Sequence, residues 1–208
     1  MRKYMTELIG TFFLVLIIGV TGIPFAIGAV LMVMVYAGGH ISGAHYNPAV
    51  TIAVLIRRKI NGTDAVFYIV AQLIGASLAA LAAHWYISSD ISPMAMTDKT
   101  ARALAGEVAG TFALAYVVLN VATAKGNTGN SFYGLAIGFT VFVMASAFGR
   151  MSGGAFNPAV ALGFWIMNVI AIKYAWIYLG CFVGGILAAL TFNFLNKEDQ
   201  PVPPIPQS

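Results

Sequence analysis

The chain has 208 residues, of which 60% are hydrophobic and only 9% are charged. A soluble globular domain carries about 25% charged residues, so this composition excludes one and indicates a membrane protein with several spanning helices. The formal net charge of +4 arises from eleven Lys and Arg residues scattered along the chain, which argues against a nucleic-acid-binding patch and for a role in membrane topology.

An apolar segment from Tyr4 to Tyr36 is long enough for one over-long helix or two short ones. Gly19, Gly22 and Pro24 lie in its middle, and a proline inside an apolar run ends or kinks the helix before it. We therefore predict two spanning helices joined by a tight turn. The alternative of one long helix stays open, and it would place the two termini on opposite sides of the membrane.

The rest of the chain predicts four further spans and two helices too short to cross a bilayer. The first short helix, 49–56, stops at a basic cluster that begins with Arg57, and its length is about 15 Å at the usual helical rise. The second short helix is expected at 158–166. The further spans are expected at 64–87, 103–121, 132–148 and 174–194.

Polar segments separate these elements. Residues 88–100 form a predicted loop and residues 125–131 a predicted turn. Residues 197–208 are polar and rich in proline, so we predict a flexible cytoplasmic tail. Residues 1–196 then form a single transmembrane domain.

Six spans place both termini on one side of the membrane, and the basic residues indicate which side. Seven Lys and Arg residues fall on the terminal side and four on the other. The positive-inside rule therefore predicts cytoplasmic termini, in a plasma membrane or cell inner membrane. The terminal-side residues are Arg2, Lys3, Arg57, Arg58, Lys59, Lys125 and Lys197, and the others are Lys99, Arg102, Arg150 and Lys173.

Two segments of the chain occur twice. HISGAHYNPAV at 40–50 returns as RMSGGAFNPAV at 150–160, and ELIGTF at 7–12 returns as EVAGTF at 107–112. We therefore predict two repeats, at about 4–87 and 103–195, each with three spans and a half-helix between the second and third. Because three is odd, the second repeat enters the membrane inverted, and the two half-helices meet near the midplane.

Both half-helices are expected to begin in the same way. An asparagine stands at the N-cap position, and a proline follows at the first helical position, where a missing N–H costs nothing. The small residues before each asparagine allow an extended backbone close to whatever it lines. The two triplets are Asn47, Pro48 and Ala49, and Asn157, Pro158 and Ala159.

Irregular backbone at membrane depth is tolerated only where protein covers it or where it lines a wet cavity. Two helix N-termini place about half a positive charge each at the meeting point, and the asparagine amides add N–H donors. A neutral molecule that donates and accepts hydrogen bonds passes there, whereas cations are repelled. The predicted pore-lining loop residues are His40, Gly43, Ala44, His45, Tyr46, Gly153, Ala155 and Phe156.

These paired motifs resemble those of the aquaporin (major intrinsic protein) family, and the resemblance covers nearly the whole chain. It implies an all-α membrane fold with six spans and two re-entrant half-helices. It also implies a homotetramer with one pore in each subunit and passive conduction of water or small neutral solutes. In such proteins two glutamates brace the half-helix loops, and the resemblance assigns that role to Glu7 and Glu107.

The chain departs from this family at the outer constriction. Family water channels usually carry an arginine directly after the second Asn-Pro-Ala and a histidine on the fifth span, where this chain has Val160 and Ala145. The same spacing adds Ile27 and Gly154, so we predict a wide, aliphatic, uncharged filter. It would pass water and solutes such as ammonia, hydrogen peroxide, glycerol or urea. The glycerol branch typically has an aspartate where this chain has Ala161, so a standard glycerol channel is not expected.

Three basic side chains leave alternatives open. Arg150, at the outer end of the fifth span, either returns a positive charge to the outer mouth or extends to the lipid headgroups. His40 and His45 border the cytoplasmic half of the pore, where they act as a pH gate or serve packing and loop hydrogen bonding.

Other functional classes fit the sequence less well. It has no zinc-protease motif, phosphate-binding glycine loop or nucleophile and base set, so we predict no enzyme, no cofactor and no metal site. An ion-coupled secondary transporter would need a titratable group in the pathway, and only Glu7 and Glu107 are available. A closed-pore structural membrane protein is the third alternative. The expected partners are membrane lipid and the permeant solutes, not nucleic acid.

Overall fold

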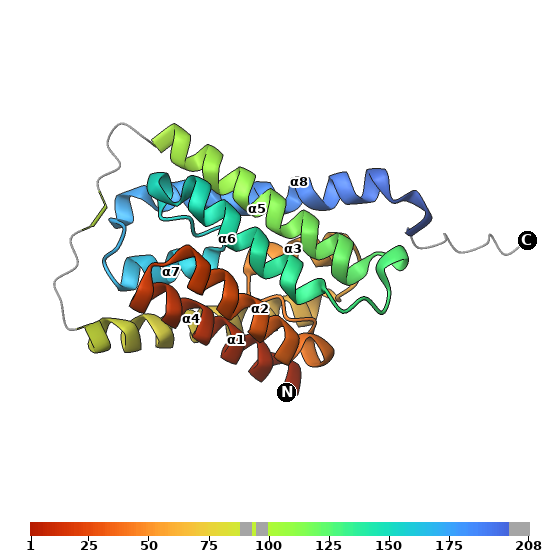
Figure 1. Cartoon of the computed structure of the whole chain (residues 1–208), viewed down its shortest axis with the longest axis horizontal. Helices are drawn as coiled ribbons and strands as arrows, with labels where there is room; N and C mark the ends of the chain where they lie inside the picture. The colour runs from red at the N-terminus through yellow and green to blue at the C-terminus, as the bar shows by residue number, and fades with distance from the viewer. Residues whose placement is uncertain (88–92, 95–99, 200–208) are drawn as a thin grey trace, which may run out of the picture.

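The computed structural model describes residues 1–87, 93–94 and 100–199, and every regular element in that part is a helix (Figure 1). Six segments are long and apolar enough to span a membrane. They are α1 (Arg2–Thr21), α2 (Pro24–Ser42), α4 (Gly62–Ile87), α5 (Thr100–Thr123), α6 (Tyr133–Ser152), and the 3₁₀ helix η2 (Ile172–Tyr178) continued by α8 (Leu179–Leu195). The half-helices are α3 (Pro48–Ile56) and α7 (Pro158–Ile166). This is the predicted all-α membrane fold with two inverted repeats.

The first apolar segment is two helices, so the single-helix alternative is wrong. Gly22 ends α1 in the left-handed conformation at φ 60°, and its N–H donates to the carbonyl of Ile18 at 3.0 Å. Glycine adopts this conformation without steric cost, and Pro24 then begins α2 at a position that needs no N–H. The chain therefore reverses within two residues.

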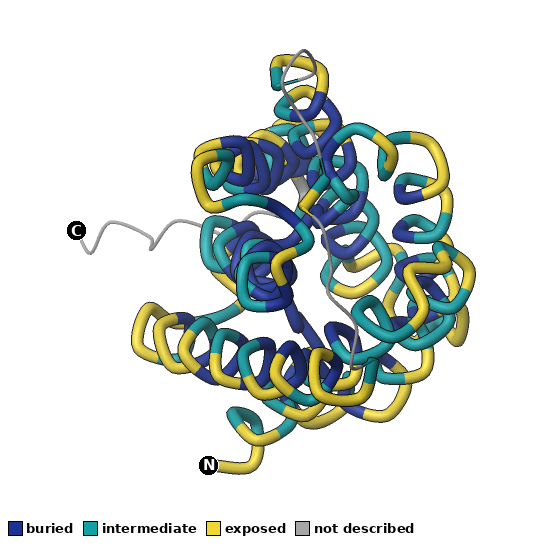
Figure 2. Tube along the Cα trace, turned by 90° about the vertical axis from the view of Figure 1, so that its left-hand side faces the viewer, coloured by how far each residue is buried: buried dark blue, intermediate teal, exposed yellow. Residues whose placement is uncertain are grey.

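The two repeats pack against each other in a crossed manner. In the first repeat α1 packs on α2 and α4, and in the second α5 packs on α6 and α8, while α2 and α6 join the repeats. Each half-helix lies against the last span of the other repeat, α3 on α8 and α7 on α4. The repeats therefore share one interior, and Figure 2 shows the buried residues turned toward it and the exposed ones around the outside.

At the α2–α6 crossing the two backbones come into direct contact. A Cβ on Gly28 would lie 2.6 Å from the carbonyl oxygen of Gly138, and one on Gly138 would lie 2.4 Å from that of Gly28. Only glycine fits at such an approach, as is common where membrane helices pack closely.

The start of α1 and the C-terminal end of α8 lie on one side of the bundle, which we call the terminal side. Lys3 Nζ lies 2.6 Å from Asp64 Oδ2 at the start of α4, and Arg57 Nη2 at the end of α3 lies 3.2 Å from Asp199 Oδ2. In Figure 1 the C-terminal end of α8 lies at the opposite end of the long axis from the C-terminal end of α4 and the start of α5. An even number of spans requires this arrangement.

The predicted polar segments fall partly outside the described residues. Most of the loop at 88–100, including Lys99, and residues 200–208 of the predicted tail lie there. The first three residues of the predicted tail form the 3₁₀ turn η3 (Lys197–Asp199), where Asp199 pairs with the buried Arg57. The turn η1 (Lys125–Asn127) occupies the predicted connection between α5 and α6.

Candidate conduction pore

The two Asn-Pro-Ala triplets cap the half-helices as predicted. Asn47 Oδ1 accepts from the N–H of Ala49 at 2.8 Å, and Asn157 Oδ1 accepts from the N–H of Ala159 at 2.9 Å. Each asparagine has extended backbone, and its side chain satisfies an N–H that the helix itself leaves unpaired. Both side chains are thereby fixed with their amide groups toward the middle of the protein.

The same two amides tie the half-helices together. Asn47 Nδ2 donates to the carbonyl of Phe156 at 2.9 Å, and Asn157 Nδ2 donates to the carbonyl of Tyr46 at 2.8 Å. A side-chain amide has two N–H groups, so one on each asparagine is left for a molecule in the pore. The two helix N-termini therefore meet with one free donor each.

Glu7 braces the first loop from behind. Its Oε1 accepts from the hydroxyl of Ser42 at 2.7 Å and from the N–H of His45 at 3.0 Å. Its Oε2 accepts from the N–H of Tyr46 at 2.7 Å and from Gln72 Nε2 at 2.8 Å. The carboxylate is fully buried, and four donors compensate the cost of removing it from water.

Glu107 holds the second loop in the same way. Its Oε1 accepts from the hydroxyl of Ser152 and from the N–H of Ala155 at 3.0 Å. Its Oε2 accepts from the N–H of Phe156 at 2.7 Å and from Cys181 Sγ at 3.3 Å. Neither glutamate is among the described residues that line the narrow cavity, and no other described carboxylate lines it.

The loop backbone is not extended, contrary to the sequence-based expectation. Ala44, Tyr46 and Phe156 have φ of 52°, 50° and 47°, in the left-handed region that costs a non-glycine residue on the order of 1 kcal/mol. This conformation lets two successive N–H groups of each loop reach one carboxylate. The glutamate hydrogen bonds offset the strain.

Two glycines that sequence reasoning missed make room for the loops. A Cβ on Gly10 would lie 2.1 Å from the ring of Tyr46, and one on Gly110 would lie 2.2 Å from the ring of Phe156. Each glycine stands three residues after a bracing glutamate in the repeated ELIGTF and EVAGTF segments. That repetition was the available signal for their role.

Two tyrosines, also missed, support the loops from the third span of each repeat. The hydroxyl of Tyr68 donates to the carbonyl of Ser42 at 2.8 Å, and that of Tyr178 donates to the carbonyl of Ser152. Both are buried and stand 110 positions apart, the offset of the Asn-Pro-Ala repeat. The repeat therefore extends to residues without an obvious motif.

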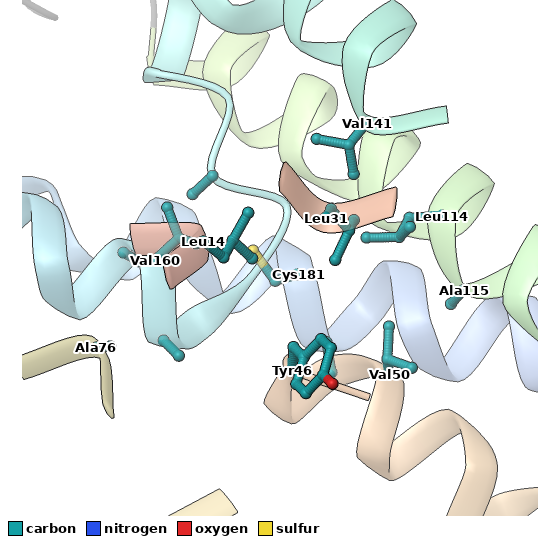
Figure 3. Packing of buried hydrophobic residues seen from close by; sticks show 14 of the residues in the cluster. Leu14, Leu31, Tyr46, Val50, Ala76, Leu114, Ala115, Val141, Val160 and Cys181 are labelled. Carbon is teal, nitrogen blue, oxygen red and sulfur yellow. The ribbon is translucent and has the colours of Figure 1, made fainter. Parts of the chain in front are cut away.

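A narrow cavity runs past the paired asparagines. It leaves about 20 Å³ for the centre of a water-sized sphere, and a single water molecule needs roughly 10–15 Å³ by this measure. Its polar lining residues are His45, Tyr46, Asn47 and Asn157, and most of the remaining wall is aliphatic. Leu14, Leu31, Leu114 and Val141 contribute to that wall and are drawn in Figure 3.

Three of the four predicted filter residues line this cavity. They are Ile27, Gly154 and Val160, whereas Ala145 is buried in α6 and Val141, one turn earlier, takes its place. The volume of the cavity describes the whole enclosed path, and the predicted width at the four filter residues stays a prediction. The wall contributed by Ile27 and Val160 is aliphatic.

The predicted loop residues divide between two spaces. Ala44, His45, Tyr46 and Ala155 line the narrow cavity, and His40, Gly43 and His45 line a wider vestibule on the terminal side. Gly153 and Phe156 are not among the described residues that line either space. The ring of Phe156 turns back onto Gly110, and only its carbonyl reaches the asparagine pair.

The vestibule on the terminal side has a volume of about 1070 Å³. Its wall combines apolar side chains with the charged side chains of Arg58 and Lys59, which follow α3, and of Asp64 near the start of α4. His45 contributes to both this space and the narrow cavity, and its Nδ1 lies 3.1 Å from Thr51 Oγ1. His45 therefore lies where the wide vestibule meets the narrow cavity.

Arg150 lies in the last turn of α6, near the other end of the cavity. Its neighbour Gly149 contacts the second loop, because a Cβ on Gly154 would lie 3.0 Å from the Gly149 Cα. Arg150 itself is exposed and does not line the cavity.

Comparison with known proteins agrees with this geometry. A family model described as Major intrinsic protein matches residues 1–192. The chain is 37% identical to Glycerol uptake facilitator protein-like 6 of Lactiplantibacillus plantarum, over 96% of this chain and 100% of that protein. It is 34% identical to Probable aquaporin NIP4-2 of Arabidopsis thaliana, over 97% of this chain and 77% of that protein.

The fold is also similar to a solved structure. The aquaglyceroporin from Plasmodium falciparum superposes with a TM-score of 0.78 at 22% identity, covering 92% of this chain and 95% of that one. Together with the capped half-helices that meet at the asparagine pair, the family match identifies the kind of protein. The chain belongs to the major intrinsic protein family and is a passive membrane channel for water or small neutral solutes, not an enzyme.

Proposed function

We propose that this channel passes water and uncharged solutes close to water in size, such as ammonia and hydrogen peroxide, through an outer constriction without charge. Val160 carries this proposal, because it lines the cavity at the position where family water channels usually have arginine. With Ile27, Ala145 and Gly154, it leaves the outer constriction with no charged side chain.

The electrostatics of the centre favour neutral permeants. Two half-helix N-termini repel cations, and the one free N–H on each asparagine gives a passing solute a hydrogen-bond donor. A solute loses hydrogen bonds along the aliphatic wall and regains some of them at this centre. Solutes that lose few hydrogen bonds should therefore pass most readily.

Glycerol and urea are larger than water, so we expect them to pass the narrow cavity less readily than ammonia or hydrogen peroxide. One relative is named for glycerol uptake, so glycerol is the informative comparison solute. For Arg150, exposure at the end of α6 favours contact with lipid headgroups over a filter role.

The outer surface supports a proposal for assembly and orientation. Large apolar side chains such as Phe67, Leu81 and Leu190 are exposed, and they would face lipid or neighbouring subunits. We expect a homotetramer in the plasma membrane or cell inner membrane. The seven basic residues of the terminal side favour cytoplasmic termini.

The test is stopped-flow measurement of purified protein in liposomes, with water, ammonia, hydrogen peroxide, glycerol and urea as permeants. We expect water, ammonia and hydrogen peroxide flux that is linear in the solute gradient and independent of ion gradients. Flux that requires an ion gradient would instead support a transporter. Intact protein with no flux above lipid would favour a closed structural role.

Substitution of the key residue gives a specific prediction. The Val160→Arg variant should keep water flux and lose ammonia flux, because the new charge offers water hydrogen bonds and narrows the path further. Val160→Leu is the control for bulk without charge. Equal ammonia flux in all three proteins would contradict the proposed role of Val160.

A further inference from the structure

The outer constriction has a counterpart in the other repeat. The two Asn-Pro-Ala copies are 110 positions apart, and the same offset relates Ile27 to Ile137 and Val160 to Val50. Each of these pairs has the same residue type in both repeats. The same shift gives Ala44 for Gly154 and Val35 for Ala145, again small or aliphatic. We call Ile137, Ala44, Val50 and Val35 the inner ring.

The cavity contacts this inner ring and the outer constriction, which we call the outer ring (Ile27, Ala145, Gly154 and Val160), in the same pattern. In the outer ring it touches Ile27, Gly154 and Val160, and Ala145 stands back from it. In the inner ring it touches Ile137, Ala44 and Val50, and Val35 stands back from it, buried. The correspondence between repeats is therefore spatial as well as sequential.

The two valines occupy equivalent positions because both half-helices are capped in the same way. Val50 and Val160 are each the third residue of a half-helix, directly after Asn-Pro-Ala, and each is 1% exposed. Because each asparagine holds its own half-helix and reaches across to the opposite loop, the valines flank the asparagine pair from its two sides.

The inner ring also marks a change in width. Ala44 lies between Gly43, which lines the vestibule, and His45, which lines both the vestibule and the narrow cavity. The space widens there from the cavity of about 20 Å³ to the vestibule of about 1070 Å³. The narrow path therefore ends at the inner ring.

We propose that the inner ring is a second selectivity constriction equivalent to the outer one, so that each solute is selected once in each repeat. This inference rests on the proposed passage of small neutral solutes. Both rings present aliphatic side chains and no charge, so each selects by size and by the hydrogen bonds that a solute gives up. Two such constrictions act in series.

Matched variants of the two rings distinguish a channel with one selectivity constriction from a channel with two. Ile27→Ala widens the outer ring, Ile137→Ala widens the inner ring, and a third protein carries both changes. The measurement is the ratio of glycerol to water permeability in liposomes, which does not depend on the amount of protein. With two constrictions, each single variant at most doubles the wild-type ratio, because the intact ring still excludes glycerol, and the double variant raises it several-fold.

A single outer filter gives a different result. Ile27→Ala alone would then reach the ratio of the double variant, and Ile137→Ala would leave the wild-type ratio unchanged; this result would overturn the inference. Wild-type protein that conducts neither water nor ammonia above lipid would instead refute the proposed function itself.

Narrowing variants keep the inference testable if the alanine variants unfold. Val50→Ile and Val160→Ile each add one methylene group, and each should lower hydrogen peroxide permeability relative to water by a similar factor. Thermal unfolding monitors the packing of both variants. A folded Val50→Ile channel with an unchanged ratio, beside a lowered ratio in Val160→Ile, would overturn the inference.

Discussion

The two half-helix loops have the same backbone conformation, but the side chains around them differ. In the first loop His45, Thr51 and Gln72 form a chain of hydrogen bonds, in which Gln72 Nε2 reaches both Thr51 Oγ1 at 3.0 Å and Glu7 Oε2 at 2.8 Å. In the second loop the residues that correspond to His45 and Thr51 are Ala155 and Ala161.

The shared part shows what the loop requires. Both loops keep a buried glutamate, a serine hydroxyl and two backbone N–H groups on that carboxylate. The fourth donor varies, an amide from Gln72 in one repeat and a thiol from Cys181 in the other. A thiol is a weak donor, so the second loop depends more heavily on its glutamate.

Removal of the carboxylate charge should have the largest effect and should break the equivalence of the loops. Glu107→Gln replaces an acceptor oxygen by an N–H, which leaves buried donors of the second loop unpaired, and we expect a loss of about 4 kcal/mol in the free energy of unfolding. Glu7→Gln should cost less, because Gln72 and Thr51 continue to pair in the first loop. Unfolding in detergent, followed by circular dichroism, measures both, and a greater loss for Glu7→Gln would contradict this ranking.

The ends of the half-helices differ as well. Arg57 follows α3 and Met167 follows α7, at corresponding positions, and both are buried. Arg57 lies over the ring of Phe192 at 4.9 Å and pairs with Asp199, whose Oδ2 also accepts from the N–H of Lys125 at 3.0 Å. The buried charge of Arg57 thus requires the carboxylate of the C-terminal turn, whereas the apolar Met167 needs no such partner.

Asp199 therefore gives the next largest effect. Asp199→Ala leaves the Arg57 guanidinium buried without its carboxylate, and we expect a loss of about 3 kcal/mol in the free energy of unfolding. Arg57→Met copies the solution of the second repeat and should change stability by about 1 kcal/mol or less.

The combination of these two changes provides the control. Adding Asp199→Ala to Arg57→Met should cost far less than adding it to the wild-type chain, because no buried charge is then left unpaired. Lys197→Gln, an exposed charge on the same turn, should have little effect. Equal losses from Asp199→Ala in both backgrounds would contradict a role through Arg57.

The fold could be predicted from the sequence because short local motifs mark the elements of each repeat. Asn47 and Asn157 with their prolines marked the helix starts, and α7 has the bounds expected from its apolar run. The odd number of spans in each repeat then implied inversion. These inferences needed only neighbouring residues and one offset.

The supports of the pore could not be predicted in this way, because they depend on partners distant in the chain. The left-handed conformation of Tyr46 and the space that Gly10 leaves for its ring depend on the packing of α1 against the loop. The turn at Asp199 depends on a partner 142 positions away. The retracted position of Ala145 depends on the rotation of α6, which spacing alone does not fix.

The loop tyrosines test whether a support shared by both repeats is equivalent in each. Tyr68→Phe and Tyr178→Phe each remove the hydroxyl that donates to a buried serine backbone carbonyl. We expect each change to cost about 1 kcal/mol in the free energy of unfolding. The two values should agree closely, in contrast to the glutamate pair. A difference as large as that between Glu7→Gln and Glu107→Gln would show that the third spans support the loops unequally.

The smallest effect concerns the polar chain of the first loop. Thr51→Ala gives this loop the residue type found at Ala161, and His45→Ala gives it the type found at Ala155. If the contact between His45 Nδ1 and Thr51 Oγ1 stabilises the loop, the two changes together should cost about 0.5–1 kcal/mol less than the sum of the single changes. Strict additivity in this double-mutant cycle would mean that the contact adds nothing, and that the first loop, like the second, is held by its glutamate, serine and backbone N–H groups alone.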